Sequence, residues 1–456
     1  MKSIVAGAPR TALLLGAAVS AFALPTFAHA QEEAQPAAPA EQAEAVAEEG
    51  NEIVVTATKR EKTLQDTPVA VSVTSAATIE RAQIRDIADL SSVVPSLKVS
   101  TNQSSFATSF SVRGFGTSGN NLGLEPSVAV FVDGVYRSRS MAQISDLPDV
   151  QRVEVLRGPQ STLFGKNASA GVISIVTKEP SYNFHGSLEG TYGNYDAMVV
   201  KGYITGAISE TVAASLAGGY NRRDGYVTNK FNGDDIGNRN RWFARGQLKF
   251  EPSNDLKIRL IADYDKIDEK CCAVFNLRTS AATSAVNFVG GQVNSYLTPF
   301  KDEVYTDVVP FNKVRNWGLS GQMDYSFGPL TLTSITAYRD TELKANQDVD
   351  FTSAAIATGA NIGQARLKTF TQEVRLASNL EGPVNFLLGA YYFNEKAQTQ
   401  DQIVYGAAFR PYVDLLIRGA TGNTLNANTV EALLTAPPGT FWQAGQGFFN
   451  TMNQKN

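Results

Sequence analysis

Few side chains of this sequence could carry out covalent or metal chemistry. Its two histidines are His29 and His185, and its two cysteines, Cys271 and Cys272, are adjacent. They leave almost no raw material for a His/Cys metal site or a Cys-His catalytic pair. The carboxylates are scattered, and the His-Glu-x-x-His, Gly-x-Ser-x-Gly and phosphate-loop patterns do not occur. The sequence therefore predicts a protein that is not an enzyme and has no permanently bound cofactor.

Asp348 and Asp350 are the carboxylates with the most suggestive spacing for a hard cation. The next carboxylate along the chain is Glu373. Because calcium takes six to eight oxygen ligands, such a site would be short of donors. Solvated loop carboxylates are the favoured interpretation, and no metal site is predicted.

Composition points away from nucleic acid and toward antiparallel sheet. The formal net charge is −4, and no basic patch with interleaved aromatic residues occurs. The 37 glycines, 16 tyrosines and 24 phenylalanines are typical of twisted antiparallel sheet with aromatic belts.

The first 30 residues have the pattern of a secretory signal peptide. Lys2 and Arg10 supply the positive region, 11–24 is the apolar core, and Ala28-His29-Ala30 is a small-x-small cleavage site. A buried N-terminal helix is the alternative. No later run reaches the roughly 18 apolar residues of a spanning helix. Entry into a membrane would therefore require a closed barrel, in which all strand edges are paired.

Two short segments follow the signal peptide. Residues 31–51 are rich in Ala, Glu, Pro and Gln, without Lys or Arg. This composition predicts a disordered linker. Residues 52–58, EIVVTAT, have a high β propensity and directly follow this linker. They could add as a strand to a partner, or form the first strand of the next domain.

Residues 59–180 read as a small α+β domain. Strands are predicted at 69–73, 110–115 and 127–133, and a helix at 76–94, ended by Pro95. Asp133-Gly134 predicts a hairpin turn. Strands at 150–156 and 171–178 predict a second hairpin around a polar loop, in which Gly158-Pro159 breaks the first strand.

From 184 onward the sequence alternates apolar and polar residues in runs of about ten, the length of a tilted membrane strand. Short connections at 209–210, 252–254, 328–329 and 380–382 alternate with long ones at 222–237, 267–311, 340–365 and from 396. This rhythm is that of an outer-membrane barrel with short periplasmic turns. About nine strands are predicted, with 399–456 as an outer loop.

Several of these motifs resemble those of TonB-dependent outer-membrane receptors. The stretch RGPQSTLFGKNASAGVISIVTKEP is similar to the signature that closes their plug domain, with mild departures at Ser161, Lys166 and Ser169-Ala170. FSVRGF resembles the Arg-Gly-Phe plug motif, SVAVFVDGVYR the plug hairpin, and EIVVTAT the TonB box. The plug-motif residues carried over are Arg113, Gly114, Phe115, Arg157, Gly158, Pro159, Gly165 and Asn167.

The resemblance implies an α+β plug domain inside an antiparallel transmembrane β-barrel. The domains would be signal peptide 1–30, linker 31–51, TonB-box-like segment 52–58, plug 59–180 and partial barrel 181–456. The family barrel has twenty-two strands, so a fragment with about nine is expected. Glu373 lies on a strand, TQEVRLAS, that resembles one whose Glu meets plug arginines. Ion pairs of Glu373 with Arg113 and Arg157 are therefore expected, although each could be an ordinary solvated charge.

The function that the resemblance implies is active import across the outer membrane of a Gram-negative bacterium. The periplasmic energy-coupling protein TonB would bind Ile53, Val54, Val55, Thr56 and Ala57. The partners would be TonB, outer-membrane lipid and an external ligand, possibly a ferric chelate, and no nucleic acid. A ferric siderophore is the expected ligand; haem, cobalamin or an oligosaccharide are alternatives, as is a passive porin-like channel. Cys271-Cys272, in an expected outer loop, would be a disulfide that rigidifies a ligand loop, or two free thiols.

Overall fold

The computed structural model describes residues 54–101, 104–119, 123–143 and 146–456. The description below concerns the unit Glu52–Asn456. The predicted signal peptide, the predicted linker and Ile53 lie outside the described residues.

The centre of the plug is a five-stranded sheet. Its order is β3-β9-β10-β7-β8, with β9 and β10 antiparallel and β7 and β10 parallel. Both predicted hairpins are present, β7–β8 and β9–β10. Val130, Val153, Val155, Ile173 and Ile175 of this sheet are buried in the main apolar core. The strands are β3 (Val71–Ser75), β7 (Val128–Val132), β8 (Val135–Arg137), β9 (Val150–Arg157) and β10 (Gly171–Thr177).

Smaller elements surround this sheet. Two further small sheets are the pair β1-β2 and a three-stranded sheet of order β4-β5-β6. The strands are β1 (Val54–Val55), β2 (Lys62–Thr63), β4 (Leu97–Thr101), β5 (Thr108–Val112) and β6 (Phe115–Gly116). The helices are α1 (Ala76–Arg81), α2 (Ser140–Gln143) and α3 (Ser161–Phe164), with the 3-10 helices η1 (Ile87–Ser92) and η2 (Ser105–Ala107).

The single helix predicted over 76–94 was wrong, because the chain breaks it into α1 and η1. Gln83 between them has φ 51°, a left-handed value that ends the first helix. Asp86 then begins the second, since its side chain accepts hydrogen bonds from the backbone N–H groups of Ala88 and Asp89. The helical spacing of the buried residues Ile79, Ile87 and Leu90 continues across α1 and η1. Periodicity alone therefore did not reveal the break between them.

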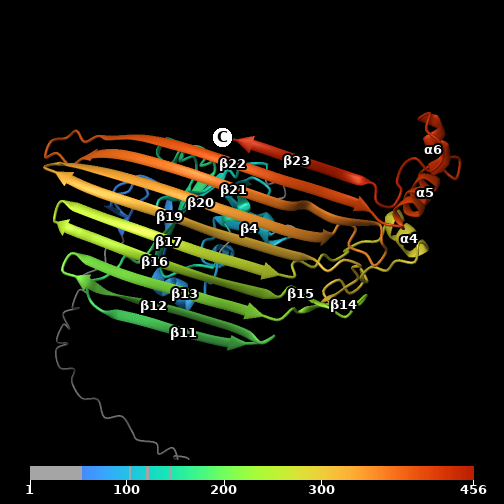
Figure 1. Cartoon of the computed structure of the whole chain (residues 1–456), viewed down its shortest axis with the longest axis horizontal. Helices are drawn as coiled ribbons and strands as arrows, with labels where there is room; N and C mark the ends of the chain where they lie inside the picture. Colours follow the sequence, from blue (N-terminus) through green and yellow to red (C-terminus); the bar gives the residue numbers. More distant parts are fainter. Residues whose placement is uncertain (1–53, 102–103, 120–122, 144–145) are drawn as a thin grey trace, which may run out of the picture. The chain divides into compact units, whose positions relative to one another are not determined.

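Most of the remainder of the unit forms an antiparallel sheet of ten strands, called the wall below. Its strands follow one another in chain order and lie side by side in Figure 1. Nine strands were predicted; the tenth, β23, lies in the stretch predicted as outer loop. The strands are β11 (His185–Gly193), β12 (Ala197–Ser209), β13 (Val212–Arg223), β16 (Arg239–Ser253), β17 (Leu256–Glu269), β19 (Phe311–Phe327), β20 (Leu330–Asp348), β21 (Ala357–Ser378), β22 (Leu387–Tyr405) and β23 (Gly447–Lys455).

The connections alternate as predicted, but several strands run further than expected. β20, β21 and β22 stay paired through much of 340–365 and the first part of the segment from 396, which were predicted as long connections. The long connections at the outer end carry a three-stranded sheet and three helices (Figure 1). These are β14 (Val227–Asn229), β15 (Asp235–Ile236), β18 (Glu303–Val304), α4 (Ala281–Phe288), α5 (Phe409–Ala420) and α6 (Ala427–Leu433).

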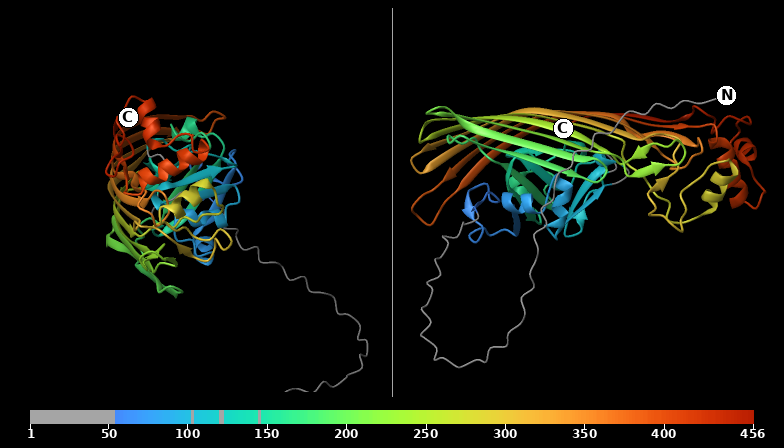
Figure 2. Two further views of the ribbon diagram at one scale, coloured as in Figure 1. Left: turned by 90° about the vertical axis from the view of Figure 1, so that its right-hand side faces the viewer. Right: turned by 90° about the horizontal axis from the view of Figure 1, so that it is seen from below.

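The two faces of the wall differ in polarity. Leu216, Leu248 and Leu260 are exposed on one face, whereas Ser215 and Arg259 on the other are buried. Figure 2 shows the plug on the concave side of the curved wall. Apolar residues outward and polar residues toward the lumen are the pattern of a membrane barrel wall. No helix in the described part of the chain is long and apolar enough to cross a membrane.

Gly134, in the β7–β8 turn, packs closely against β20 of the wall. Its φ is 76°, and a Cβ built there would lie 2.9 Å from Cδ1 of Ile335. Val135 next to it is buried with Ile335 and Ala337 of the wall. The turn therefore needs glycine both for its backbone conformation and for space.

We expect Gly134→Ala to lower the free energy of unfolding by about 1–3 kcal/mol, from left-handed backbone strain and overpacking. Unfolding of the purified chain in detergent micelles measures this. Gly382→Ala is the matched control, because a Cβ there would meet nothing within 4 Å. Equal stability of both variants would contradict the close approach.

Candidate functional site

The segment predicted to couple to TonB is packed into the plug. Val54 and Val55 pair with Thr63 and Lys62 as a two-stranded ribbon. Val55 and Ala57 are fully buried in a cluster with plug-core residues. The Thr56 backbone N–H donates to Oε1 of Glu154 at 2.9 Å, and its hydroxyl donates to the same oxygen at 3.1 Å. Glu154 is fully buried and also accepts from Arg152 at 2.8 Å. Four of the five predicted coupling residues therefore lie in or beside a folded ribbon.

Glu373 contacts the plug through Lys59. The distance from the Lys59 Nζ to Oε2 of Glu373 is 3.3 Å, and Arg375 lies 3.4 Å from the other oxygen. Lys59 also lies 4.5 Å from the ring centroid of Phe164. Burial lowers the pKa of the Lys59 ammonium, and Glu373 opposes this shift.

The expected ion pairs of Glu373 with Arg113 and Arg157 are not formed among the described residues. Arg113 is exposed at the β5–β6 turn with φ 53°. Arg157 ends β9, where its backbone N–H donates to the Ala70 carbonyl at 2.9 Å. Both lie at turns of the plug, whereas Lys59 lies in the segment that reaches β21. Lys59 gave no sequence signal because it follows the β-prone stretch as one charge among several.

The other plug-motif residues shape turns. Gly114, Gly158 and Gly165 all have positive φ, at 84°, 89° and 78°. Phe115 is largely exposed. Asn167, with φ 69°, donates from its side chain to the Tyr136 hydroxyl at 2.8 Å. Pro159 follows Gly158 directly, ahead of α3. Gly158, Pro159, Gly165 and Asn167 thus set the path of the chain between β9 and β10, whereas Gly114 and Phe115 lie at the β5–β6 turn.

Asp133, at the tip of the β7–β8 hairpin, forms the first of three charged clusters between plug and wall. Its carboxylate pairs with Arg245 of β16 and, at 3.4 Å, with Arg259 of β17. It also accepts from the Thr177 backbone N–H at 2.9 Å. Burial alone would raise the pKa of this carboxyl, but Arg259, Arg245 and Thr177 outweigh it and lower the pKa from its usual value.

Arg241 of β16 is the centre of the second cluster. Its guanidinium reaches the plug carboxylates of Asp86 at 3.1 Å and Asp146 at 3.3 Å. It also donates to Glu269 of β17 at 2.5 Å, and Glu269 accepts from the Ser105 hydroxyl at 3.2 Å. Arg241, Arg245 and Arg259 alternate with apolar residues along their strands, a pattern that does not identify their partners.

Glu395 of β22 forms the third cluster. The Arg139 Nε donates to Oε1 of Glu395 at 3.0 Å, and the Ser138 and Thr369 hydroxyls donate to Oε2. Arg139 and Glu395 are both completely buried. Because an unpaired charge there would be costly, each partner fixes the other.

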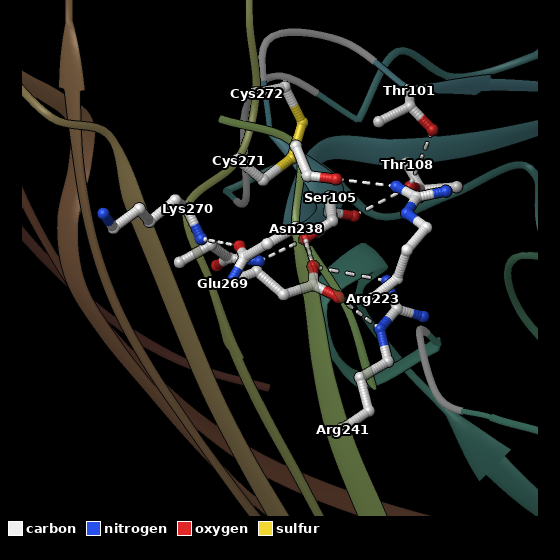
Figure 3. The surroundings of a disulfide bond; sticks show 12 residues. Thr101, Ser105, Thr108, Arg223, Asn238, Arg241, Glu269, Lys270, Cys271 and Cys272 are labelled. Carbon is white, nitrogen blue, oxygen red and sulfur yellow. Dashed lines mark hydrogen bonds and ion pairs between the residues drawn. A yellow bond between two sulfur atoms is a disulfide. The ribbon is translucent and has the colours of Figure 1, made fainter. Parts of the chain in front are cut away.

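A cavity of about 200 Å³ opens next to the Arg241 cluster at the outer end of the wall. Plug hydroxyls line one side, from Thr101, Ser105 and Thr108, and the wall side includes Arg223, Tyr226 and the cysteines. Cys271 and Cys272 form a disulfide. In Figure 3 the disulfide lies close to Ser105 and Glu269. Glu269 accepts hydrogen bonds from both the Ser105 hydroxyl and the Arg241 guanidinium. Arg223 lies 4.8 Å from the Tyr226 ring centroid, and its Nε has no hydrogen-bond partner.

The loop carboxylates do not assemble a metal centre. In the described ranges, no group of three or more His, Cys, Asp or Glu residues could bind a metal ion. Asp348 ends β20 and is buried, so the interpretation of Asp348 as a solvated loop carboxylate was wrong. Its carboxylate accepts from the backbone N–H of Asp350 at 3.1 Å. This is local loop geometry of the kind expected for Asx turns.

The plug region matches a known family. Residues 63–172 match the family described as "TonB-dependent Receptor Plug Domain". The chain is 34% identical over 159 residues to the pesticin receptor of Yersinia pestis, which covers 35% of this chain and 23% of that protein. It is 29% identical over 180 residues to the vitamin B12 transporter BtuB of Vibrio vulnificus, covering 38% of this chain and 28% of the transporter.

Solved structures show the same fold over more of the chain. The ferric yersiniabactin uptake receptor FyuA of Yersinia pestis superposes with a TM-score of 0.63 at 22% identity, covering 74% of this chain and 50% of that one. The receptor FpvA of P. aeruginosa bound to iron pyoverdine gives 0.61 at 16% identity, covering 78% and 46%. The chain thus spans about half the length of these structures, and the plug with part of a barrel wall is the shared architecture.

We expect Asp133→Asn to destabilise the folded chain at neutral pH by about 3–5 kcal/mol, because two arginines lose a buried partner. The lowered pKa of Asp133 means that its contribution is present above the unfolded value of about 3.9 and is lost as pH falls through the lower folded value. Thermal unfolding in detergent between pH 2 and 7 should therefore converge for parent and variant at the acid end.

Asp224→Asn is the control for this experiment, since Asp224 forms an exposed pair with Arg222 at 3.2 Å. Exposed pairs contribute little, so its unfolding should follow the parent at every pH. A constant stability difference between parent and Asp133→Asn across the whole range would refute the linkage.

Proposed function

We propose that this chain, a TonB-dependent receptor of the Gram-negative outer membrane, takes part in energy-coupled import of a scarce external ligand. The observation that carries the proposal is a plug packed against the concave face of a barrel wall and joined to it by buried charges. A passive pore needs no such obstruction of its lumen. Transport against a gradient needs one that opens only on demand.

The coupling segment is Ile53, Val54, Val55, Thr56 and Ala57. Its β-branched residues suit strand addition to TonB. In the described state Val55 and Ala57 are buried and Thr56 is bound to Glu154, so this ribbon must leave the plug before it can pair with a partner. Coupling would then cost the Thr56–Glu154 hydrogen bonds and the burial of two small side chains. Such a cost is modest, as expected for a segment that is engaged and released repeatedly.

A ferric siderophore is the ligand that we favour. Relatives named for siderophore uptake support this choice, together with the outer cavity. That cavity combines plug hydroxyls, the Tyr226 ring and an Arg223 guanidinium with an unpartnered Nε. Cationic donors and an aromatic face suit the anionic oxygen groups of iron chelates. Haem, cobalamin and oligosaccharides are the alternatives that the growth test below distinguishes.

We expect a strain that lacks this receptor to lose growth on one ferric chelate under iron limitation. Ferric yersiniabactin and ferric pyoverdine would be supplied in parallel with haem, cobalamin and maltodextrin. A receptor lacking residues 53–57 should restore surface binding but not growth, because coupling requires strand addition. Growth that survives this deletion would favour a passive channel.

We expect Arg223→Ala to weaken binding of the supporting chelate to de-energised cells by about tenfold, since a hydrogen bond to a charged group contributes roughly 1.5 kcal/mol or more. Binding of radioactive iron in that chelate measures this. Arg222→Ala is the matched control, because Arg222 is the exposed neighbour on the same strand. Equal affinity of the two variants would exclude Arg223 from the ligand site.

A further inference from the structure

The face of the wall that points away from the plug carries a row of aromatic side chains. The row consists of three ring pairs, with centroids 4.8 Å apart in Trp242–Tyr264, 5.6 Å in Trp317–Tyr338 and 6.2 Å in Phe370–Tyr392. Between this row and the short turns, the same face of β16 to β22 has no charged residue in the described part of the chain. Aromatic belts lie where the hydrocarbon of a membrane meets the headgroups. The row therefore marks the outer boundary of the membrane-spanning part of the wall.

Basic side chains lie directly beyond this row, on the same face. Lys266, Arg315 and Lys368 are each two residues from an aromatic residue of the row, toward the outer end. Residues two apart on a strand share a face. Seven exposed residues of β17 to β22, called the basic band below, occupy this position: Lys266, Lys313, Arg315, Lys344, Arg366, Lys368 and Lys396.

Three carboxylates on the same face neutralise only part of the basic band. Asp268 is shared by two lysines, Glu342 by an arginine and a lysine, and Asp340 pairs with one arginine. Lys368 and Lys396 form no ion pair with any residue that the structure describes. The band therefore has a surplus of positive charge at the level of the lipid headgroups.

Like charges face one another across the strands of the basic band. In three places a cation lies directly opposite a second cation in the strand register: Lys266–Arg315, Lys313–Lys344 and Lys368–Lys396. Like charges directly opposite each other destabilise a sheet. Three such pairs in one band indicate an anionic partner that lies between the side chains.

An apolar groove of about 760 Å³ adjoins the basic band on its membrane side. Tyr264 and Trp317, which are two residues from Lys266 and Arg315, belong to its lining. Small residues with larger leucines line much of the remainder, namely Gly218, Ala244, Gly246, Ala262, Leu216 and Leu319. An anion bound by Lys266 and Arg315 would therefore lie at the end of a groove that has room for a hydrocarbon chain.

We propose that the basic band binds the phosphate groups of an anionic lipid of the outer leaflet, with one acyl chain of that lipid in the groove. Clustered Lys and Arg side chains next to a membrane recognise anionic headgroups. A phosphorylated glycolipid such as lipid A has the required chemistry, because its phosphates lie beside its acyl chains. The inference goes beyond the proposed import function, since this surface faces lipid and lies apart from the plug and the outer cavity.

Lys368→Gln with Lys396→Gln tests the charge contribution, because neither lysine loses an ion pair. Native mass spectrometry of the purified full chain in a neutral detergent would measure binding of phosphorylated lipid A. We expect the apparent Kd of the double variant to rise about tenfold, since both cations contact the anionic headgroup. Equal affinity of parent and double variant would overturn the proposal.

Two further variants separate binding from folding and from net charge. Lys230→Gln with Lys301→Gln is the matched control, because it removes two lysines from the outer connections, and it should bind like the parent. Lys368→Arg with Lys396→Arg keeps both charges and should keep the affinity. Without lipid, the glutamine variant should unfold at or above the parent temperature, because one repulsive pair is removed. A lower unfolding temperature would contradict the argument from opposed like charges.

Dephosphorylated lipid A and inorganic phosphate identify the source of the anion. We expect dephosphorylated lipid A to bind at least tenfold more weakly than the phosphorylated form, and inorganic phosphate not to displace the latter at equal concentration. Equal binding with and without phosphates would remove the basic band from the site. Displacement by inorganic phosphate would assign the band to a soluble anion and overturn the lipid proposal. None of these results depends on whether the chain imports a chelate.

Discussion

Charge pairing across the plug–wall interface is the constraint on which the structure depends. The lumen side of the wall carries arginines and carboxylates that the plug buries, and a buried charge without a partner would destabilise the fold. Asp133, Asp86, Asp146 and Arg139 supply the complementary charges from the plug. Asp133 lies at a turn, Asp86 and Arg139 lie at the starts of short helices, and Asp146 forms an isolated β-bridge with Asp86, so local backbone geometry fixes where each charge meets the wall.

These ion pairs fix the position of the plug against the wall more than they stabilise the fold. Their Coulomb attraction is largely offset by desolvation, but removing one partner leaves the other exposed to the full penalty. The plug therefore packs against the wall in a single defined position. An interface that relied on apolar contacts alone would tolerate sliding, and the hairpin tip at Gly134 has no room for that.

The pairs are unevenly distributed over the wall. The Asp133, Arg241 and Glu395 clusters and the Lys59–Glu373 pair lie on β16, β17, β21 and β22. The outer cavity beside the Cys271–Cys272 disulfide lies next to the Arg241 cluster, so a ligand there would contact residues that also position the plug.

The sequence by itself determined the local elements. Alternation of side chains predicted the wall strands, Asp133-Gly134 predicted the β7–β8 turn, and the stretch from Arg157 to Pro180 pointed to the plug family, because each signal depends on neighbours in the chain. Only the tertiary structure decided which charges meet. Glu373 pairs with Lys59 rather than Arg113 or Arg157, and the 76–94 segment breaks at Gln83 so that Asp86 can reach Arg241. These choices depend on contacts between residues more than a hundred positions apart, and no local periodicity encodes them.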